Sequence, residues 1–306
     1  MLKSIKLVLT AGLALILGIT AGSAVLWAQS PPEKNQATLV IGLIPEQNIF
    51  KQLERYEPLA EYLSKRIGAA IKLKVLVRYG NIVDNFVSSQ MDAAFFGSFT
   101  YCLAHVKLGV EAIARPVNSS GISTYHGLIL VRKDSGIQTA QDMRGKRFAF
   151  VDKATTAGYL LPLAFFKENG IQDYKTYLKE TYFAGTHQDA IYDVLNKKAD
   201  VAAAKNTIFD RFAAQDPRIK QEMTVLGRSP DVPENGLAVK RDLNTNLKNR
   251  LKSTLLNMHQ DNEGEKILRR FGARKFIPNT TEDYANVFKF AHIIGLNLTT
   301  YNYLND

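Results

Sequence analysis

Apolar segments of strand length alternate with helical patterns in the first third of the chain. An apolar run at 38–45 precedes a helical pattern at 50–67. Strand patterns return at 71–77 and 91–97, and a short helical pattern at 81–89 separates them. Strands that alternate with helices at this spacing are typical of a parallel α/β sheet.

The same alternation continues through the rest of the chain. Predicted strands lie at 125–132, 146–151, 182–187, 200–204 and 237–240. Predicted helices lie at 139–143, 160–169, 188–196, 247–258, 264–271 and 281–294. Two α/β units predict two lobes with a cleft between them. Since ligands of such sheets bind at the carboxyl ends of the strands, we expect a ligand in that cleft.

This pattern predicts a two-lobed α/β protein in which each lobe is a mostly parallel sheet flanked by helices. The first lobe comprises residues 38–128 and 238–306, and the second comprises residues 129–237. Two connecting strands, near 125–132 and 229–240, join the lobes. We expect these strands to act as a hinge.

The N-terminal residues have the pattern of an export signal. Lys3 and Lys6 precede an uncharged run that extends from residue 7 to residue 28, which predicts a signal peptide at 1–28. The polar residues 29–37 that follow are expected to form a flexible leader. The apolar run is also just long enough to span a bilayer, so an uncleaved anchor is the alternative.

Composition and charge add few constraints. Of the 306 residues, 46% are hydrophobic and 22% are charged, which is ordinary for a globular protein with room for two domains. Without Lys3 and Lys6, the 39 basic residues become 37 against 29 acidic ones, a net charge of +8. A positive chain favours anionic ligands or an anionic membrane surface. The charge is spread along the chain, however, and no nucleic-acid-binding motif is present.

Several kinds of site are not indicated by the sequence. Cys102 is the single cysteine, so we expect no internal disulfide and a fold that depends on its hydrophobic core. No two histidines have the spacing of metal ligands, and we expect neither a metal nor a cofactor. No nucleophile–base pair or carboxylate pair is visible, which argues against an enzyme.

A hydroxyl-rich loop is the main candidate for binding chemistry. Thr155 and Thr156 lie between the predicted strand at 146–151 and the predicted helix at 160–169. The unpaired N–H groups and the positive dipole end of a helix N-terminus make such a loop a ready anion site. The alternative is that one of the threonines only caps the helix.

Six stretches, taken in order, resemble the periplasmic phosphate-, phosphite- and phosphonate-binding proteins of ABC importers, the PhnD-like group with a type II periplasmic binding protein fold. The resemblance extends from about Leu39 to Phe271. The six stretches are Ile41–Pro45, Tyr56–Leu63, Met91–Gly97, Ile137–Val151, Ala154–Pro162 and Gly185–Ala190.

The resemblance implies a periplasmic, monomeric receptor that closes over a small oxyanion and delivers it to an ABC transporter permease in the inner membrane. It also implies which residues bind the ligand. By position in the family's motifs, these are Thr155, Thr156, Ala157, His187, Tyr101 and Tyr125. A buried phosphonate needs several such donors, because unpaired oxygens in a closed cleft are costly.

Lys205 is a departure from the family's pattern. Relatives carry an acidic residue after the corresponding strand, whereas this chain has Lys205 followed by Asn206. A lysine in the site would disfavour a ligand that carries an amine and favour additional negative charge. The alternative is that Lys205 points to solvent and Asn206 fills the site.

Two nearby residues and one rival function complete the expectations. Glu46, after the first strand, is expected to orient a donor or to face solvent, because its carboxylate would repel an anion. Tyr79 either lines the cleft or only helps to form a turn. The rival function is a sensory protein in which the same fold, anchored by an uncleaved signal, reports bound ligand to a membrane partner.

Overall fold

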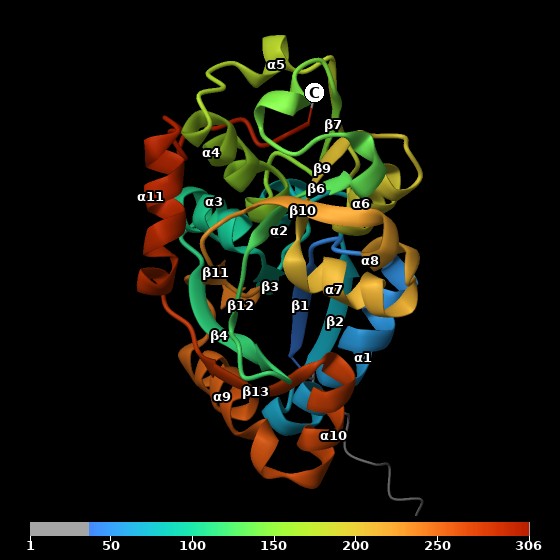
Figure 1. Cartoon of the computed structure of the whole chain (residues 1–306). Coiled ribbons are helices and arrows are strands. Elements are labelled where there is room, and N and C mark those ends of the chain that lie inside the picture. Colours follow the sequence, from blue (N-terminus) through green and yellow to red (C-terminus); the bar gives the residue numbers. More distant parts are fainter. Residues whose placement is uncertain (1–36, 306) are drawn as a thin grey trace, which may run out of the picture. The chain divides into compact units, whose positions relative to one another are not determined.

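The computed structural model describes residues 37–305, which are organised by two large β-sheets (Figure 1). The predicted signal peptide and nearly all of the predicted leader lie outside these residues. Within residues 37–305, no helix combines the length and the apolar character needed to cross a membrane.

The first sheet has six strands in the order β13-β4-β12-β3-β1-β2. Their bounds are β1 Thr38–Leu43, β2 Ala70–Val75, β3 Ala93–Phe96, β4 Glu111–Asn118, β12 Gly236–Val239 and β13 Ala273–Pro278. β1 pairs in parallel with β2 and β3. β12 and β13 pair antiparallel with their neighbours β3 and β4. We call the part of the chain built around this sheet the first lobe.

The second sheet has five strands in the order β10-β6-β9-β7-β8 and defines the second lobe. Their bounds are β6 Gly127–Arg132, β7 Arg147–Phe150, β8 Glu180–Phe183, β9 Val201–Lys205 and β10 Met223–Arg228. β7 is parallel to β8 and β9, while β6 is antiparallel to β9 and β10. Both sheets are therefore mixed, and the prediction of mostly parallel sheets is wrong in this respect. Parallel neighbours need a crossover connection, whereas strands that carry the chain between lobes can run antiparallel.

Helices follow most strands. In the first lobe they are α1 Ile49–Ile67, α2 Asn81–Ser88, α3 Ser98–Leu108, α9 Thr245–Asn257, η4 Met258–Gln260 and α10 Asn262–Phe271. In the second lobe they are η1 Lys133–Ser135, η2 Gln141–Met143, η3 Thr156–Leu160, α4 Leu161–Glu168, α5 Tyr174–Tyr177, α6 His187–Leu195, α7 Asn206–Gln215 and α8 Arg218–Glu222. The C-terminal part forms η5 Thr281–Tyr284 and α11 Ala285–Ile293.

The helix α1 illustrates how local sequence sets the boundaries. The Asn48 side chain accepts a hydrogen bond from the Phe50 N–H and caps the first turn. Gly68 ends the helix at φ 64°, a left-handed conformation that glycine adopts without steric cost. Between these caps, buried side chains that include Leu59 and Leu63 form the stripe that packs on the first sheet.

Two short strands lie where the chain passes between the two sheets. β5 (Thr124–Tyr125) pairs antiparallel with β11 (Val232–Pro233), so the two connections are held side by side. β6 begins directly after β5, and β12 begins soon after β11 (Figure 1). The two connections between the sheets therefore run next to each other at this point.

The C-terminal tail contacts both lobes. The Tyr303 hydroxyl donates to Asp84 of α2 at 2.6 Å. Two residues later, the Asn305 side chain donates to Asp152 at 3.0 Å and accepts from the Lys153 N–H at 3.0 Å. The tail therefore links the first lobe to the loop that carries the predicted anion site.

Candidate functional site

Four helices begin after strand ends in one buried region between the two sheets. These are α3 after β3, η3 after β7, α6 after β8 and α7 after β9. The Phe99 N–H at the start of α3 donates to the Thr156 hydroxyl oxygen of η3 at 2.8 Å. The Lys205 N–H before α7 donates to Nδ1 of His187 in α6 at 3.3 Å. Helix N-termini that meet in this way concentrate N–H donors and positive dipole ends in one place.

The hydroxyl-rich loop is buried at the start of η3. Thr155, Thr156 and Ala157 are each less than 5% exposed. The Thr155 hydroxyl donates to the Asp152 carbonyl oxygen at 2.7 Å, and the Asp152 carboxylate accepts from the Ala154 N–H at 2.8 Å. Hydrogen bonds between side chains and backbone within the loop therefore fix its conformation. η3 is a π-helical turn, so its first N–H groups remain outside the ladder of helical hydrogen bonds.

Close packing under this loop depends on Gly158. A methyl group at Gly158 would lie 2.4 Å from Cβ of Val151 and 2.7 Å from Oγ1 of Thr155. Both neighbours would have to move, because real Cβ contacts are not this short. We therefore expect Gly158→Ala to lower the free energy of unfolding by about 1–3 kcal/mol.

Urea unfolding of wild type and Gly158→Ala measures this cost. Gly170→Ala is not a suitable control, because Gly170 has a φ of 76° that strains any substitution. Ala140→Gly, another change of one methyl group in the same lobe, controls for the size of the substitution. Equal stability of Gly158→Ala and wild type would contradict the close packing of this loop.

Tyr125 joins the loop to the first lobe. Burial raises the pKa of its hydroxyl, against the opposing effects of the Lys205 charge and of hydrogen bonds with the Thr156 and Ser98 side chains. The Ser98 hydroxyl in turn donates to the Pro233 carbonyl oxygen at 2.6 Å. The Tyr125 hydroxyl therefore lies between the N-termini of α3 and η3.

Lys205 lies at the centre of a buried ion cluster. Its side chain is 3% exposed, so the alternative that it points to solvent is wrong. The ammonium donates to Oε1 of Glu46 at 3.0 Å, to Oε1 of Glu234, and to Oδ1 of Asn235 at 3.2 Å. It also lies 4.3 Å from the centroid of the Tyr125 ring, within cation–π range.

Charge compensation keeps this cluster ionised despite its burial. Burial alone would lower the pKa of Lys205, but Glu234 and Glu46 raise it above its ordinary value. Burial alone would raise the pKa of Glu46, but Lys205, Arg55 and Arg211 lower it to about 2. The expectation that Glu46 orients a donor agrees with its contact to the ammonium.

His187 and Tyr79 form the opposite side of the buried region. Their rings lie in an edge-to-face arrangement with centroids 5.9 Å apart. Burial lowers the pKa of His187 to about 3, so the imidazole is neutral near pH 7. The Tyr79 hydroxyl is buried and has no hydrogen-bond partner among the described residues. A buried donor without a partner is costly, which marks Tyr79 as a candidate ligand contact.

The lowered pKa of His187 predicts acid sensitivity. Below pH 6.5 the His187 imidazole is protonated in the unfolded chain but stays neutral in the folded protein. The free energy of unfolding therefore decreases as the pH falls towards 3. Between pH 7 and pH 5, His187 alone should lower the free energy of unfolding by about 2 kcal/mol. Urea titrations at both pH values, with wild type and His187→Gln, measure this difference.

The His187→Gln variant is the appropriate comparison because its amide does not titrate and can still accept from the Lys205 N–H. All other acid-sensitive groups are shared by the two proteins, so their effects cancel. An equal loss of stability in wild type and His187→Gln would show that the imidazole does not resist protonation.

The structure does not bring every predicted binding residue into this region. The Tyr101 hydroxyl hydrogen-bonds with the Thr281 hydroxyl at 2.7 Å, and its ring packs on Tyr284 with centroids 4.1 Å apart. Tyr101 therefore faces η5, away from Thr156. Asn206 uses its side-chain oxygen to accept from the His126 N–H at 3.0 Å, which fixes the start of α7 to the connecting strand.

Some residues of the region had no signal in the sequence. Glu234 and Asn235 follow β11 and reach Lys205 across a sequence separation of about 30 residues. Ser98 begins the helix α3, Ser98–Leu108, for which no helix was predicted from the sequence. The approach of Glu234 to Lys205 depends on how the two connections between the sheets pair.

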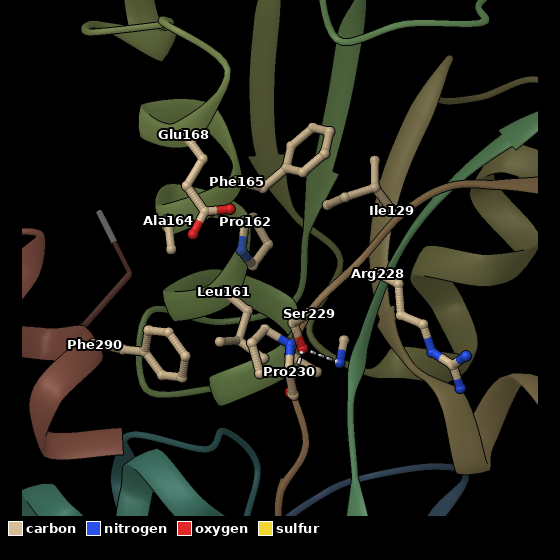
Figure 2. Close-up of a pocket in the computed structure, with 12 residues that line it drawn as sticks. Ile129, Leu161, Pro162, Ala164, Phe165, Glu168, Arg228, Ser229, Pro230 and Phe290 are labelled. Carbon is tan, nitrogen blue, oxygen red and sulfur yellow. Dashed lines mark hydrogen bonds between the residues drawn. The ribbon is translucent and has the colours of Figure 1, made fainter. Parts of the chain in front are cut away.

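The cavities near the region differ in size. The cavity in Figure 2 is lined by α4 residues such as Leu161 and Phe165 on one side and by Arg228 and Ser229 on the other. Its volume of about 20 Å³ suffices for one water molecule and is too small for a phosphonate. A second cavity of about 400 Å³ opens beside Lys205 and is also lined by Arg55 and Arg211, among others.

The sequence and the fold are similar to those of known binding proteins. The profile of one family, described as ABC transporter, phosphonate, periplasmic substrate-binding protein, matches residues 41–284. The phosphonates-binding periplasmic protein of Escherichia coli is 24% identical over 80% of this chain and 73% of its own length. A probable ABC transporter phosphite-binding protein of Prochlorococcus marinus is 24% identical, over 84% of this chain and 90% of its own.

Two solved structures show a shared fold. A binding-protein component of an ABC phosphonate transporter from Pseudomonas aeruginosa has a TM-score of 0.79 and 23% identity, covering 85% of this chain and 87% of its own. A Prochlorococcus marinus protein in complex with methylphosphonate has a TM-score of 0.75 and 21% identity, covering 84% and 98% of the two chains. The α/β architecture with two mixed sheets is therefore the two-lobed fold of periplasmic binding proteins.

Proposed function

The chain belongs to the family of periplasmic substrate-binding proteins of phosphonate ABC transporters, and we propose that it captures a phosphonate, phosphite or phosphate between its lobes. The bound oxyanion is then delivered to a membrane permease, and the protein works as a monomer in the periplasm. This proposal makes it a transport protein that binds its ligand without chemical change.

The observation that carries the proposal is the contact between Phe99 and Thr156. It joins the N-terminus of α3, from the first lobe, to the N-terminus of η3, from the second. An oxyanion between these two ends would accept from both sets of N–H groups and would bind the lobes to each other. Charge-assisted hydrogen bonds of this kind are about twice as strong as neutral ones.

Side chains around the two helix ends supply further donors. The hydroxyls of Thr155, Thr156 and Tyr125 are buried beside the η3 N-terminus. The Tyr79 hydroxyl, which has no partner among the described residues, completes this set when it donates to an oxyanion. The Thr155 hydroxyl donates to the Asp152 carbonyl oxygen and would have to exchange this bond for one to the ligand. With that exchange, four neutral donors can satisfy several oxygens of a phosphonate without adding a second buried charge.

The neighbouring carboxylate does not prevent anion binding. Glu46 and Glu234 both contact the Lys205 ammonium, and Arg55 and Arg211 lie close enough to lower the pKa of Glu46 further. The local charge is therefore close to balanced, although Glu46 alone would repel an anion. We assign the lysine a supporting position beside the oxyanion rather than a direct contact with it.

Isothermal titration calorimetry tests the proposal on the mature protein. We expect saturable one-to-one binding of at least one ligand among phosphate, phosphite and methylphosphonate, and weaker or absent binding of acetate at equal concentration. Calorimetry suits this protein because its one tryptophan, Trp27, lies in the predicted signal peptide. A protein that binds none of the three phosphorus oxyanions at millimolar concentration would refute the proposed function.

A further inference from the structure

We infer that the pocket around the Lys205 ammonium is a cation site that the protein fills with its own side chain, and that this makes the protein select phosphorus oxyanions without an amine. We call the four groups around the ammonium the Lys205 cage: Glu46, Glu234, Asn235 and the Tyr125 ring. The inference rests on the proposed function, because it concerns which members of the ligand class are accepted.

The cage satisfies a primary ammonium completely. An ammonium group has three N–H donors, and the Lys205 ammonium has three oxygen acceptors, on Glu46, Glu234 and Asn235. The face of the Tyr125 ring, whose centroid lies 4.3 Å from the ammonium, adds a cation–π contact. Two carboxylates, an amide oxygen and an aromatic face are the groups that would recognise the amine of a ligand.

The cage and the proposed oxyanion site share one residue. The Tyr125 ring lies 4.3 Å from the Lys205 ammonium, and the Tyr125 hydroxyl lies near enough to the Thr156 side chain for that side chain to oppose the rise of its pKa. A ligand whose oxyanion lies at the η3 N-terminus would therefore direct a short alkyl chain along this ring towards the cage. In a 2-aminoethylphosphonate, the amine at the end of that chain would meet Lys205.

With Lys205 in place, a ligand amine has no acceptor in the cage. The acceptors are occupied, and a second ammonium would meet the first as a like charge in a buried site. We expected from the sequence that Lys205 would favour additional negative charge on the ligand, and the cage changes this expectation. Its charge is already compensated by Glu46 and Glu234, so it acts by excluding a cation.

Removing the lysine side chain should expose the cage to external cations. In Lys205→Ala, Glu46 and Glu234 lose their common counter-charge while the Tyr125 ring and Asn235 remain. In Lys205→Met, a side chain of similar length fills the same space without a charge. The two variants therefore separate an open cage from a filled one, and both lack the positive charge.

The first experiment measures the affinities of ethylphosphonate and 2-aminoethylphosphonate by calorimetry. We expect wild type to bind ethylphosphonate at least 10-fold more tightly than the amine-bearing ligand. In Lys205→Ala the ratio of the two affinities should shift by 100-fold or more towards 2-aminoethylphosphonate, and in Lys205→Met it should shift much less. The same ratio in wild type and Lys205→Ala, or equal affinities in wild type, would overturn the inference.

The second experiment does not depend on phosphonate binding. Ethylammonium chloride at 10–100 mM should raise the midpoint of thermal unfolding of Lys205→Ala relative to sodium chloride at equal concentration, since a ligand that binds the folded state stabilises it. Wild type and Lys205→Met should show no such difference. A rise in all three proteins, or in none, would contradict a cage that accepts an external ammonium.

The two experiments separate failure of this inference from failure of the proposed function. If no protein binds a phosphorus oxyanion, the proposed function fails, and the ethylammonium measurement still decides whether the cage binds cations. If Lys205→Ala does not fold, the affinity ratio in wild type decides the inference by itself.

Discussion

Replacing Lys205 with methionine is expected to lower the free energy of unfolding by about 3–5 kcal/mol, because it removes the ammonium that pairs with one buried and one partly buried carboxylate. Glu46 and Glu234 both contact the ammonium, and Glu46 is almost fully buried. Methionine has a similar length and is apolar, so the loss of volume is small. The destabilisation therefore reports the unpaired charges rather than a cavity.

A triple variant separates the charge effect from other effects of the substitution. When Glu46→Gln and Glu234→Gln are combined with Lys205→Met, all three members of the ion pairs are neutral, and most of the lost stability should return. Lys197→Met is the matched control, because Lys197 pairs with Asp134 on the surface with both side chains exposed. An exposed pair of this kind contributes less than about 1 kcal/mol.

Urea unfolding followed by circular dichroism measures all three variants against wild type. A Lys205→Met protein as stable as Lys197→Met would show that the ion cluster is not formed in solution. Failure of the triple variant to regain stability would instead mean that the lysine stabilises the fold through packing.

Replacing Thr155 and Thr156 together with valine is expected to weaken oxyanion binding by about 2–6 kcal/mol, taking each lost hydrogen bond to a charged group as about 1.5–3 kcal/mol. Valine keeps the shape of threonine and removes the hydroxyl. The substitution also removes the acceptor of the Phe99 N–H, because that N–H donates to the Thr156 hydroxyl oxygen at 2.8 Å. The backbone N–H groups at the η3 N-terminus remain, so some affinity should persist.

Calorimetry with the tightest-binding phosphorus oxyanion measures this effect, and Thr176→Val serves as the control. Thr176 is an exposed residue of α5 in the same lobe, so its hydroxyl should not affect affinity. The double variant should stay folded, with a stability loss of about one to two helix-capping interactions. Unchanged affinity in the double variant would remove the threonines from the binding site.

Local patterns predicted several strand–helix units of the fold, but not the helices α3 and α7 or the strand β10. The helix predicted at 50–67 corresponds to α1, Ile49–Ile67, because a cap, an apolar stripe and a glycine all lie within one segment. The strands β4 and β13 were missed. They pair with each other across a sequence separation of about 160 residues, and Arg115 and Pro116 interrupt the apolar pattern of β4. Pairing of this kind is tertiary information that no short window contains.

For the candidate site, too, local properties could be predicted from the sequence and long-range contacts could not. The position of Thr156 at a helix start is a local property, and the sequence indicated it. The orientation of Tyr101 is not local, since it depends on where α3 begins and on the packing of η5 against it. The contact of Glu234 with Lys205 depends on how two connections between the lobes pair, so the compensation of the lysine charge could not be predicted.

A crystal structure of the mature protein with methylphosphonate at saturating concentration would locate the bound oxyanion. We expect the phosphonate oxygens within hydrogen-bond distance of the Thr155 and Thr156 hydroxyls and of the N–H groups that begin η3, with Tyr79 donating from the first lobe. We also expect Lys205 to keep its contacts to Glu46 and Glu234. A ligand bound elsewhere on the protein, with this loop unoccupied, would contradict the proposed binding site.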